Sequence, residues 1–332
     1  MAITANEKVL TIDYWKAARN LEIGDIVFDR NGELCKIVSI QQYRSDQCYE
    51  VRFGDVNKIT GDRHLGFPIE DETYRRKVRR YKGKRQFTAS IRIKRIQDLL
   101  GQPLREVRDN RSSYSSPTTK ALQLPAQDLP VPPFVFGFWF FNRKKKGHMI
   151  FPKGREEVIT EKFKSYGYKI VPGWITPNGT RKFTTIPDIR SQLSRFDPGR
   201  IPANYLLASA EQRFEMLSGF IHSRVNWYQT RWKIFRVTAK GLALFRDITC
   251  LIESLGIVIY ETKKSSTYGT YTVAFKTQHR ILEEQVVKPI KVHADRRYLK
   301  KIKPIEPQLC VHIETDGADK TFLAGEGFIA CL

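Results

Sequence analysis

The sequence predicts a multidomain protein in which an all-β domain is interrupted by an inserted α+β domain. Two observations carry this prediction: strand-like patterns fill both ends of the chain, and a region with both helical and strand patterns lies between them. A chain of 332 residues is long enough for two or three domains of ordinary size, each with its own core. One β domain split by an insertion accounts for this order.

The first part of the chain is rich in β-branched and aromatic residues arranged in short runs. These runs cover residues 22–28, 34–40 and 48–53, and turn-forming residues at 29–32 separate the first two. Short strands at this spacing are typical of a compact all-β unit. The tail from 309 to 332 alternates apolar and polar residues again, so we expect strands there as well.

The middle of the chain has a different character. The segment before it is rich in serine, threonine and proline and is predicted to be a linker, because this composition does not sustain helix or sheet. Helical spacing appears at 209–222 and 242–255, and Gly256 is a typical helix-ending residue. The predicted division is, in order, 1–75 for the N-terminal part of the β domain, 76–108 for a basic DNA-contacting segment, 109–132 for the linker, 133–290 for the α+β domain with halves at about 133–200 and 201–290, and 291–332 for the C-terminal part of the β domain.

A formal charge of +22 indicates a polyanionic partner. Cationic side chains that neutralise phosphates release condensed counterions, so nucleic acid is the partner that this charge favours. An anionic membrane surface is the competing interpretation. It is disfavoured because the basic residues are interleaved with strand-like and turn-rich sequence rather than gathered on one amphipathic helix.

Neither a membrane span nor a zinc site is predicted. The most apolar run, 134–141, is too short to cross a bilayer, and the start of the chain has no long apolar core. We therefore expect a soluble intracellular protein, in the cytoplasm and associated with nucleoid or phage. The five cysteines form no CxxC pair and the histidines show no ligand spacing, so reduced thiols are expected rather than a metal site or a disulfide framework.

One segment concentrates positive charge without any intervening acid. Between Arg75 and Arg95 the aromatic residues Tyr81 and Phe87 are interleaved with the cations, a pattern that favours phosphate contact over a merely solvated face. The residues assigned to nucleic-acid binding here are Arg75, Arg76, Lys77, Arg79, Arg80, Lys82, Lys84 and Arg85.

Several motifs at the two ends of the chain resemble the Hint domain of inteins. The stretch 9–11 with Trp15 and 21–28 is similar to the opening of that domain, and Ile59-Thr-Gly-Asp-Arg-His64 is similar to its block with a threonine and a histidine. The stretch 321–329 resembles its last strands. The resemblance implies a β domain built for protein splicing.

The middle of the chain resembles a LAGLIDADG homing endonuclease. Residues 133–143 are similar to the first helix that names this family, and 217–225 to the second; the lead-in 201–209 and the later 253–256 fit as well. The resemblance implies two pseudo-symmetric αββ-type halves whose helices pack closely through small residues. The predicted packing residues are Gly137 and Gly219.

The two positions where this family places metal-binding aspartates hold Asn142 and Arg224. Metal-assisted cleavage of a phosphodiester needs anionic oxygen ligands, which neither side chain supplies. A shift of a few residues in the alignment would not place an acid at either position, because no Asp or Glu occurs between Asp128 and Glu156 or between Glu215 and Asp247. No metal or other cofactor is therefore expected, apart from Mg²⁺ if some cleavage activity remains.

Cations fill the places around both helices. We hypothesise that Arg143 and Arg224 lie where metals would be and pair with DNA phosphates, since a guanidinium matches a phosphate bidentately. The alternative is that these residues drifted and contact only solvent, and the sequence does not choose between the two. The residues assigned to nucleic acid in this domain are Arg143, Lys144, Lys145, Lys146, Arg224, Arg231, Lys233, Arg236, Lys263 and Lys264.

The splicing residues of the Hint resemblance are also altered. The chain starts Met1-Ala2 and ends Ala330-Cys-Leu332, so the nucleophile at the start and the cyclising asparagine at the end are missing, and only His64 remains of the splicing block. We expect a splicing-deficient scaffold. The fold class is thus an all-β Hint-type domain interrupted by an α+β LAGLIDADG-like domain.

Three functions follow from these motifs. The first is a cleavage-deficient, double-stranded DNA-binding protein, expected to be a monomer with internal pseudo-symmetry. The second is an active or weakly active homing endonuclease whose metals are held by remote acids such as Asp188 or Glu156. The third is a structural subunit that docks onto RNA or a nucleoprotein complex.

Overall fold

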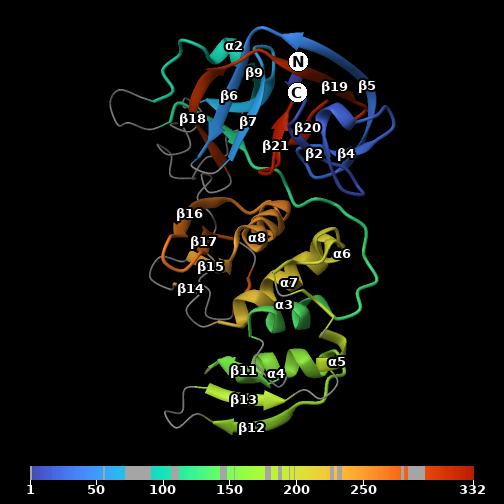
Figure 1. Cartoon of the computed structure of the whole chain (residues 1–332), viewed down its shortest axis with the longest axis vertical. Coiled ribbons are helices and arrows are strands. Elements are labelled where there is room, and N and C mark those ends of the chain that lie inside the picture. The colour runs from blue at the N-terminus through green and yellow to red at the C-terminus, as the bar shows by residue number, and fades with distance from the viewer. Residues whose placement is uncertain are drawn as a thin grey trace, which may run out of the picture. The chain divides into compact units, whose positions relative to one another are not determined.

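The computed structural model forms two compact units that alternate along the chain (Figure 1). The β unit contains residues 1–123, 256–261 and 289–332, and the inserted unit contains 124–255 and 262–288. The structure describes residues 2–54, 57–71, 91–105, 112–142, 148–152, 154–175, 181–185, 189–193, 195–197, 199–224, 228–229, 234–277, 280–282 and 296–332.

The β unit consists mainly of a ten-stranded and a four-stranded sheet in its described part. Their orders are β4-β5-β19-β1-β7-β6-β18-β10-β8-β9 and β21-β20-β2-β3. The elements are β1 (Ala2–Thr4), β2 (Lys8–Leu10), β3 (Trp15–Ala17), η1 (Ala18–Asn20), β4 (Ile26–Phe28), β5 (Leu34–Ser45), β6 (Cys48–Phe53), β7 (Asn57–Asp62), β8 (Gly66–Asp71), β9 (Ile91–Arg95), α2 (Ile96–Leu99), β10 (Tyr114–Pro117), β18 (Arg296–Ile305), β19 (Gln308–Thr315), β20 (Phe322–Ala324) and β21 (Ile329–Cys331).

Strands from the two ends of the chain pair with one another in this unit. β19 lies between β5 and β1, with Ile3 opposite Val311, and β18 pairs with β6 (Figure 1, red strands among blue ones). Ile3, Val51 and Val311 belong to one buried apolar cluster, so the core is closed only when both ends are present. The strands predicted at both ends are confirmed.

The structure corrects the predicted linker and the predicted basic segment. The linker, 109–132, contains a strand: β10 lies between β18 and β8, with Ser115 opposite Tyr298 on one side and Glu70 on the other. Neighbouring strands supply hydrogen-bond partners that outweigh its weak local preference for sheet. The basic segment, 76–108, is described only at 91–105; this part contains β9 and α2, and β9 pairs with β8, so it belongs to the β unit.

The inserted unit has two halves of similar construction. The first is α3 (Pro133–Asn142), β11 (His148–Pro152), α4 (Glu156–Ser165), β12 (Val171–Ile175), β13 (Arg181–Thr185) and α5 (Ile189–Leu193); the second is α6 (Ala203–Leu206), α7 (Ala210–His222), β14 (Tyr228–Gln229), β15 (Ile234–Lys240), α8 (Leu242–Ser254), β16 (Ile259–Ser265) and β17 (Thr270–Phe275). The first three residues of β16 cluster with the β unit, and the strand continues into the sheet of the second half. The sheets run β11-β13-β12 and β14-β15-β17-β16, so the last strand of each half lies at the centre of its sheet. The predicted fold class is confirmed.

The helix ends follow local sequence signals. Ser209 caps the start of α7, accepting from the Gln212 backbone while the Gln212 side chain accepts from the Ser209 backbone. α8 ends at Ser254, two residues before Gly256, whose φ of 72° lies in the left-handed region. Both helices predicted from spacing are therefore confirmed.

The backbones of α3 and α7 are in direct contact. A Cβ atom added to Gly137 would lie 2.2 Å from the Met216 carbonyl oxygen, and one added to Gly219 would lie 2.2 Å from that of Phe134. Both predicted packing residues lie in this contact. Most of α3 is buried, so aromatic rings surround the two glycines, for example Phe140 beside Phe220 with centroids 5.9 Å apart.

We expect Gly219→Ala to lower the free energy of unfolding of the inserted unit by about 2 kcal/mol, because its methyl group would overlap two backbone atoms of α3. Urea denaturation followed by tryptophan fluorescence measures this change. Gly199→Ala is the matched control, since its methyl group would meet only the Asp197 carboxylate at 3.4 Å. Equal stability of both variants would contradict a helix contact of this kind.

Candidate nucleic-acid interface

The C-terminal ends of α3 and α7 meet at the position where the sequence predicted a degenerate cleavage site. Asn142 and Arg224 occupy matching places, each five residues after the packing glycine of its helix, Gly137 or Gly219. The last carbonyls of a helix lack partners within the helix and carry partial negative charge. The chemistry of this junction therefore depends on which side chains face those carbonyls.

Asn142 is buried and serves the fold. Its side-chain amide nitrogen donates to the Ile150 carbonyl, and its amide oxygen accepts from the Ile150 backbone nitrogen at 3.1 Å. Only 2% of the residue is exposed. The amide thus fastens the end of α3 to β11, and both of its polar atoms are engaged by backbone.

Arg224 is exposed and lies just beyond the end of α7. Its Nη2 atom donates to the Phe141 carbonyl oxygen at 2.7 Å, so its guanidinium reaches across to the last turn of α3. A cation at a helix C-terminus is electrostatically favourable. The structure thus places Arg224 between the two helix ends, bonded to protein on at least one side.

Arg155 is a third residue of this junction, which the sequence-based site prediction did not include. It precedes α4 and is 6% exposed, and its Nη1 atom donates to the carbonyl oxygens of Ile221 at 3.1 Å and Arg224 at 3.2 Å. A buried guanidinium is stable only when acceptors surround it, and the carbonyls of Ile221 and Arg224 at the end of α7 supply two of them. The sequence places Arg155 among the cations that follow the first helix, but no local pattern predicts that its side chain is buried against α7.

The side chains at this junction do not fit a divalent metal. Mg²⁺ requires several hard oxygen ligands, commonly carboxylates, whereas the described groups here are a neutral amide engaged by backbone and two guanidinium cations. Across the described part of the chain, no group of three or more His, Cys, Asp or Glu side chains is arranged to hold a metal ion. Among the remote acids proposed as ligands, Glu156 lies in the first turn of α4 and Asp188 lies outside the described residues.

The sheet of the second half presents a cationic face. Along β15 the side chains of Phe235, Val237 and Ala239 are buried, and Tyr271, opposite Ala239, contacts α8 through Phe245 at 5.1 Å. Alternate residues of a strand point to opposite faces. The face away from α8 therefore carries the side chains of Arg236, Thr238, Lys240, Thr270 and Thr272.

These residues suit a polar, anionic partner. Thr238 and Thr272 are joined through their hydroxyl oxygens at 2.9 Å, and Thr238 lies between Arg236 and Lys240 along β15. On the neighbouring strand β16, Lys263 and Lys264 are exposed. The Lys264 ammonium lies 5.8 Å from the centre of the Tyr271 ring, which contacts α8, so Lys264 is near the other face of the sheet. Lysine, arginine and threonine side chains are common ligands of phosphate oxygens.

Most of the predicted cationic residues lie outside the described part of the chain. Those within it are Arg224, Arg236, Lys263 and Lys264. Those outside it are Arg75, Arg76, Lys77, Arg79, Arg80, Lys82, Lys84, Arg85, Arg143, Lys144, Lys145, Lys146, Arg231 and Lys233.

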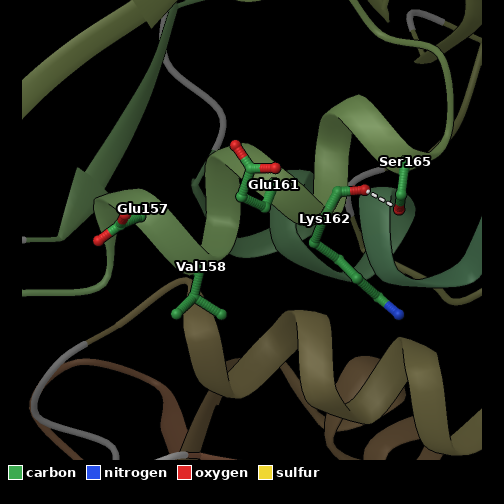
Figure 2. A pocket seen from close by; sticks show the side chains of 5 residues that line it. All are labelled: Glu157, Val158, Glu161, Lys162 and Ser165. Carbon is green, nitrogen blue, oxygen red and sulfur yellow. Dashed lines mark hydrogen bonds between the residues drawn. The ribbon is translucent and has the colours of Figure 1, made fainter.

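A shallow hollow of about 530 Å³ runs along α4 and is lined by that helix alone (Figure 2). Val158 and Lys162 point toward α7, where the Lys162 ammonium is 3.0 Å from Glu215, while Glu157 and Glu161 point away (Figure 2). Because its two acids lie on the outward side of one helix, the hollow is a surface feature of helix packing.

In the β unit, the buried carboxylate of Asp62 accepts hydrogen bonds from three other residues, including Ala2 near the start of the chain. Its Oδ1 atom accepts from the backbone nitrogens of Ala2 and His64, each at 3.1 Å, and its Oδ2 atom accepts from the Tyr43 hydroxyl at 2.6 Å. Burial, and then the bond to Asp62, raise the pKa of the Tyr43 hydroxyl. His64, the predicted splicing remnant, is exposed.

The end of the chain joins the same turn. Leu332 and Gly66 exchange two backbone hydrogen bonds of 2.9 and 3.0 Å, so both chain ends flank the turn between β7 and β8 (Figure 1). The sequence-based prediction missed Asp62, although it stands within the motif Thr-Gly-Asp-Arg-His that was identified. Within the described residues, no helix has both the length and the apolar character needed to cross a membrane.

A β unit closed by both chain ends, around an insert with two glycine-packed helices, is similar in architecture to an intein that carries a LAGLIDADG homing endonuclease. No protein-family model matches the chain. A curated relative is the replicative DNA helicase DnaB of Mycobacterium intracellulare, 23% identical over 339 residues and covering 95% of this chain. The chain spans 55% of the length of that relative.

Solved structures of two kinds are similar to the chain. The crystal structure of the MchDnaB-1 intein aligns with 99% of this chain and 98% of its own, at 8% identity and a TM-score of 0.33. The homing endonuclease I-DmoI, in complex with DNA and Mn, aligns with 44% of this chain and 89% of its own, at 11% identity and a TM-score of 0.32. The gp41-1 intein aligns with 34% and 73%, at 17% identity and a TM-score of 0.23.

We expect Asn142→Asp to destabilise the inserted unit rather than to create a metal site. The new carboxylate would face the Ile150 carbonyl oxygen, and the loss of a buried hydrogen bond costs about 1–3 kcal/mol. Burial and this carbonyl should raise the pKa of the new acid in the folded state.

The stability of this variant should therefore depend on pH. The proton is bound more tightly in the folded state, so the deficit is small below about pH 4, the ordinary aspartate value, and grows as the pH rises through the folded-state value. Urea unfolding at pH 5 and pH 8 measures it, with the exposed Asn204→Asp as control. Equal losses for both variants at pH 8 would contradict the structural role of Asn142.

Proposed function

We propose that this chain is an intein-derived, homing-endonuclease-like protein that binds double-stranded DNA without cutting it. The observation that carries the proposal is the junction of α3 and α7, where a backbone-bound amide and two guanidinium groups occupy the positions at which the resemblance implies metal-binding acids. Cleavage assisted by metal ions needs carboxylate ligands at that place. Electrostatic attraction for phosphate needs only the cations.

The face of β15 and β17 that points away from α8 supports the binding part of this proposal. Arg236 and Lys240 flank the threonine pair on the two interior strands of the sheet, where their cationic side chains suit contact with DNA phosphates. The formal charge of +22 adds long-range attraction to a polyanion. Phosphate contacts would position the protein, and the polar side chains of the sheet would contact base edges.

The β unit then serves as a scaffold that is deficient in splicing. Ala2 has no nucleophilic atom, and its backbone nitrogen is held by the buried carboxylate of Asp62. Protein splicing requires a hydroxyl or thiol at the start of the reaction. The replicative helicase relative suggests that this scaffold descends from an intein in a DnaB-type host protein.

A second candidate function is weak endonuclease activity with a metal bound through Glu156. This acid directly follows Arg155, whose guanidinium reaches the end of α7, so it is the described carboxylate adjacent in sequence to the junction. A nicking assay separates the two functions.

We expect the protein to bind a random 30-base-pair duplex in EDTA, with an affinity that falls steeply between 50 and 200 mM NaCl. Arg236→Gln should reduce the salt dependence by about one counterion. Lys164→Gln is the control, because this lysine lies on α4 beside Glu161 and away from the sheet. Fluorescence anisotropy measures the affinity, with structured RNA as competitor.

In the same preparation, supercoiled plasmid should remain intact in Mg²⁺ or Mn²⁺. Metal-dependent nicking that disappears in Glu156→Gln would favour the endonuclease. Stronger binding to RNA than to duplex would contradict the proposed partner.

A further inference from the structure

Two guanidinium groups lie at the junction of α3 and α7, and one of them contacts the residue that carries the other. We use the name guanidinium junction for the side chains of Arg155 and Arg224 together with the carbonyls of Phe141, Ile221 and Arg224 that they contact. Arg155 donates to the backbone carbonyl of Arg224, and the side chain of Arg224 donates to the backbone of α3. One buried cation thus fixes the residue that carries the exposed one.

Arg155 is buried and hydrogen-bonded, so its side chain is an integral part of the junction. Removing a cation from water is costly unless hydrogen bonds replace the hydration, and here one Nη1 atom contacts two carbonyls of the final turn of α7. Those carbonyls and the partial negative charge of the helix end are an environment that favours a cation. A drifted surface residue would have no such set of acceptors.

Arg155 also limits where the Arg224 side chain can go. The Arg224 carbonyl is held by Arg155 at 3.2 Å and its guanidinium by Phe141 at 2.7 Å, so the residue is fixed at both its backbone and its tip. A guanidinium that is already oriented loses less entropy when it binds an anion. Its planar group is suited to the paired oxygens of a phosphodiester.

We propose that Arg155 takes the place of a divalent cation at this junction and positions Arg224 as a fixed receptor for a DNA phosphodiester. The inference deepens the proposed function and rests on it. Arg155 is a positioning residue, because it contacts the helix end and Arg224 rather than the DNA. Two consequences follow: DNA binding needs no metal, and the effect of Arg155 on binding passes through Arg224.

The test is a double-mutant cycle of duplex affinity, measured by fluorescence anisotropy at 100 mM NaCl in EDTA. Arg224→Gln and Arg155→Gln should each weaken binding about tenfold and each lower the salt dependence by about one counterion. The double variant should be no weaker than the weaker single variant, because the two residues act in series. Arg155→Lys, which keeps the charge, should recover part of the affinity.

Controls separate positioning from general damage. Arg200→Gln removes an arginine of the same unit whose guanidinium contacts Asp247 twice, so it should leave duplex affinity within twofold. Thermal unfolding identifies any variant that has lost its fold. If Arg155→Gln is unfolded, the double-mutant cycle is measured with Arg155→Lys instead. Hydrogen exchange of the backbone amides at 221–224 should accelerate in the Arg155 variants without DNA.

The outcomes are distinct. Additive losses in the double variant, unchanged affinity of folded Arg155 variants, or wild-type affinity that rises tenfold or more with 5 mM MgCl₂ would overturn this inference while the proposed function stands. Failure of the wild-type protein to bind any duplex would overturn both. Wild-type binding that is no more than tenfold tighter in MgCl₂ than in EDTA, with series behaviour in the cycle, supports the inference, because Mg²⁺ as a DNA counterion can only weaken binding that needs no metal.

Discussion

The backbone contact between α3 and α7 is the constraint on which the inserted unit depends. Two helices can approach this closely only where both lack a Cβ atom, and Gly137 and Gly219 each face the backbone of the other helix. This contact fixes the crossing of the helices and brings their C-terminal ends together. The junction follows from it, because the carbonyls at the C-terminal ends of both helices then lie within reach of the same side chains.

Convergence of helix ends creates a demand for positive charge. In a metal-dependent nuclease, acids at the helix ends hold divalent ions that meet this demand and also perform chemistry. In this chain Arg155 donates to the carbonyls of Ile221 and Arg224, and Arg224 donates to the carbonyl of Phe141. A guanidinium stabilises the helix ends and attracts phosphate, but it does not activate water. Under the proposed function, these side chains attract phosphate without a part in cleavage.

The β unit depends on a different constraint, the pairing of segments from opposite ends of the chain. β1 and β19 pair directly, so the insert of more than 130 residues must leave and return without displacing them. The buried Asp62 then connects the N-terminal strand to the turn at His64. Asp62 thus joins these segments through two backbone N–H groups and the Tyr43 hydroxyl, and none of these bonds involves the side chain of Ala2.

The sequence by itself determined the order of the elements, because strand alternation, helix caps such as Ser209 and the stop at Gly256 are local signals. It also showed that no acid stands near positions 142 and 224, because the residues present in a segment can be read without any knowledge of its structure. Only the tertiary structure showed that Asn142 is fastened to Ile150 and that Arg155 reaches the end of α7, and only the surrounding sheet made 114–117 a strand. These outcomes depend on residues distant in sequence that come together only when the backbone folds, and no local pattern encodes them.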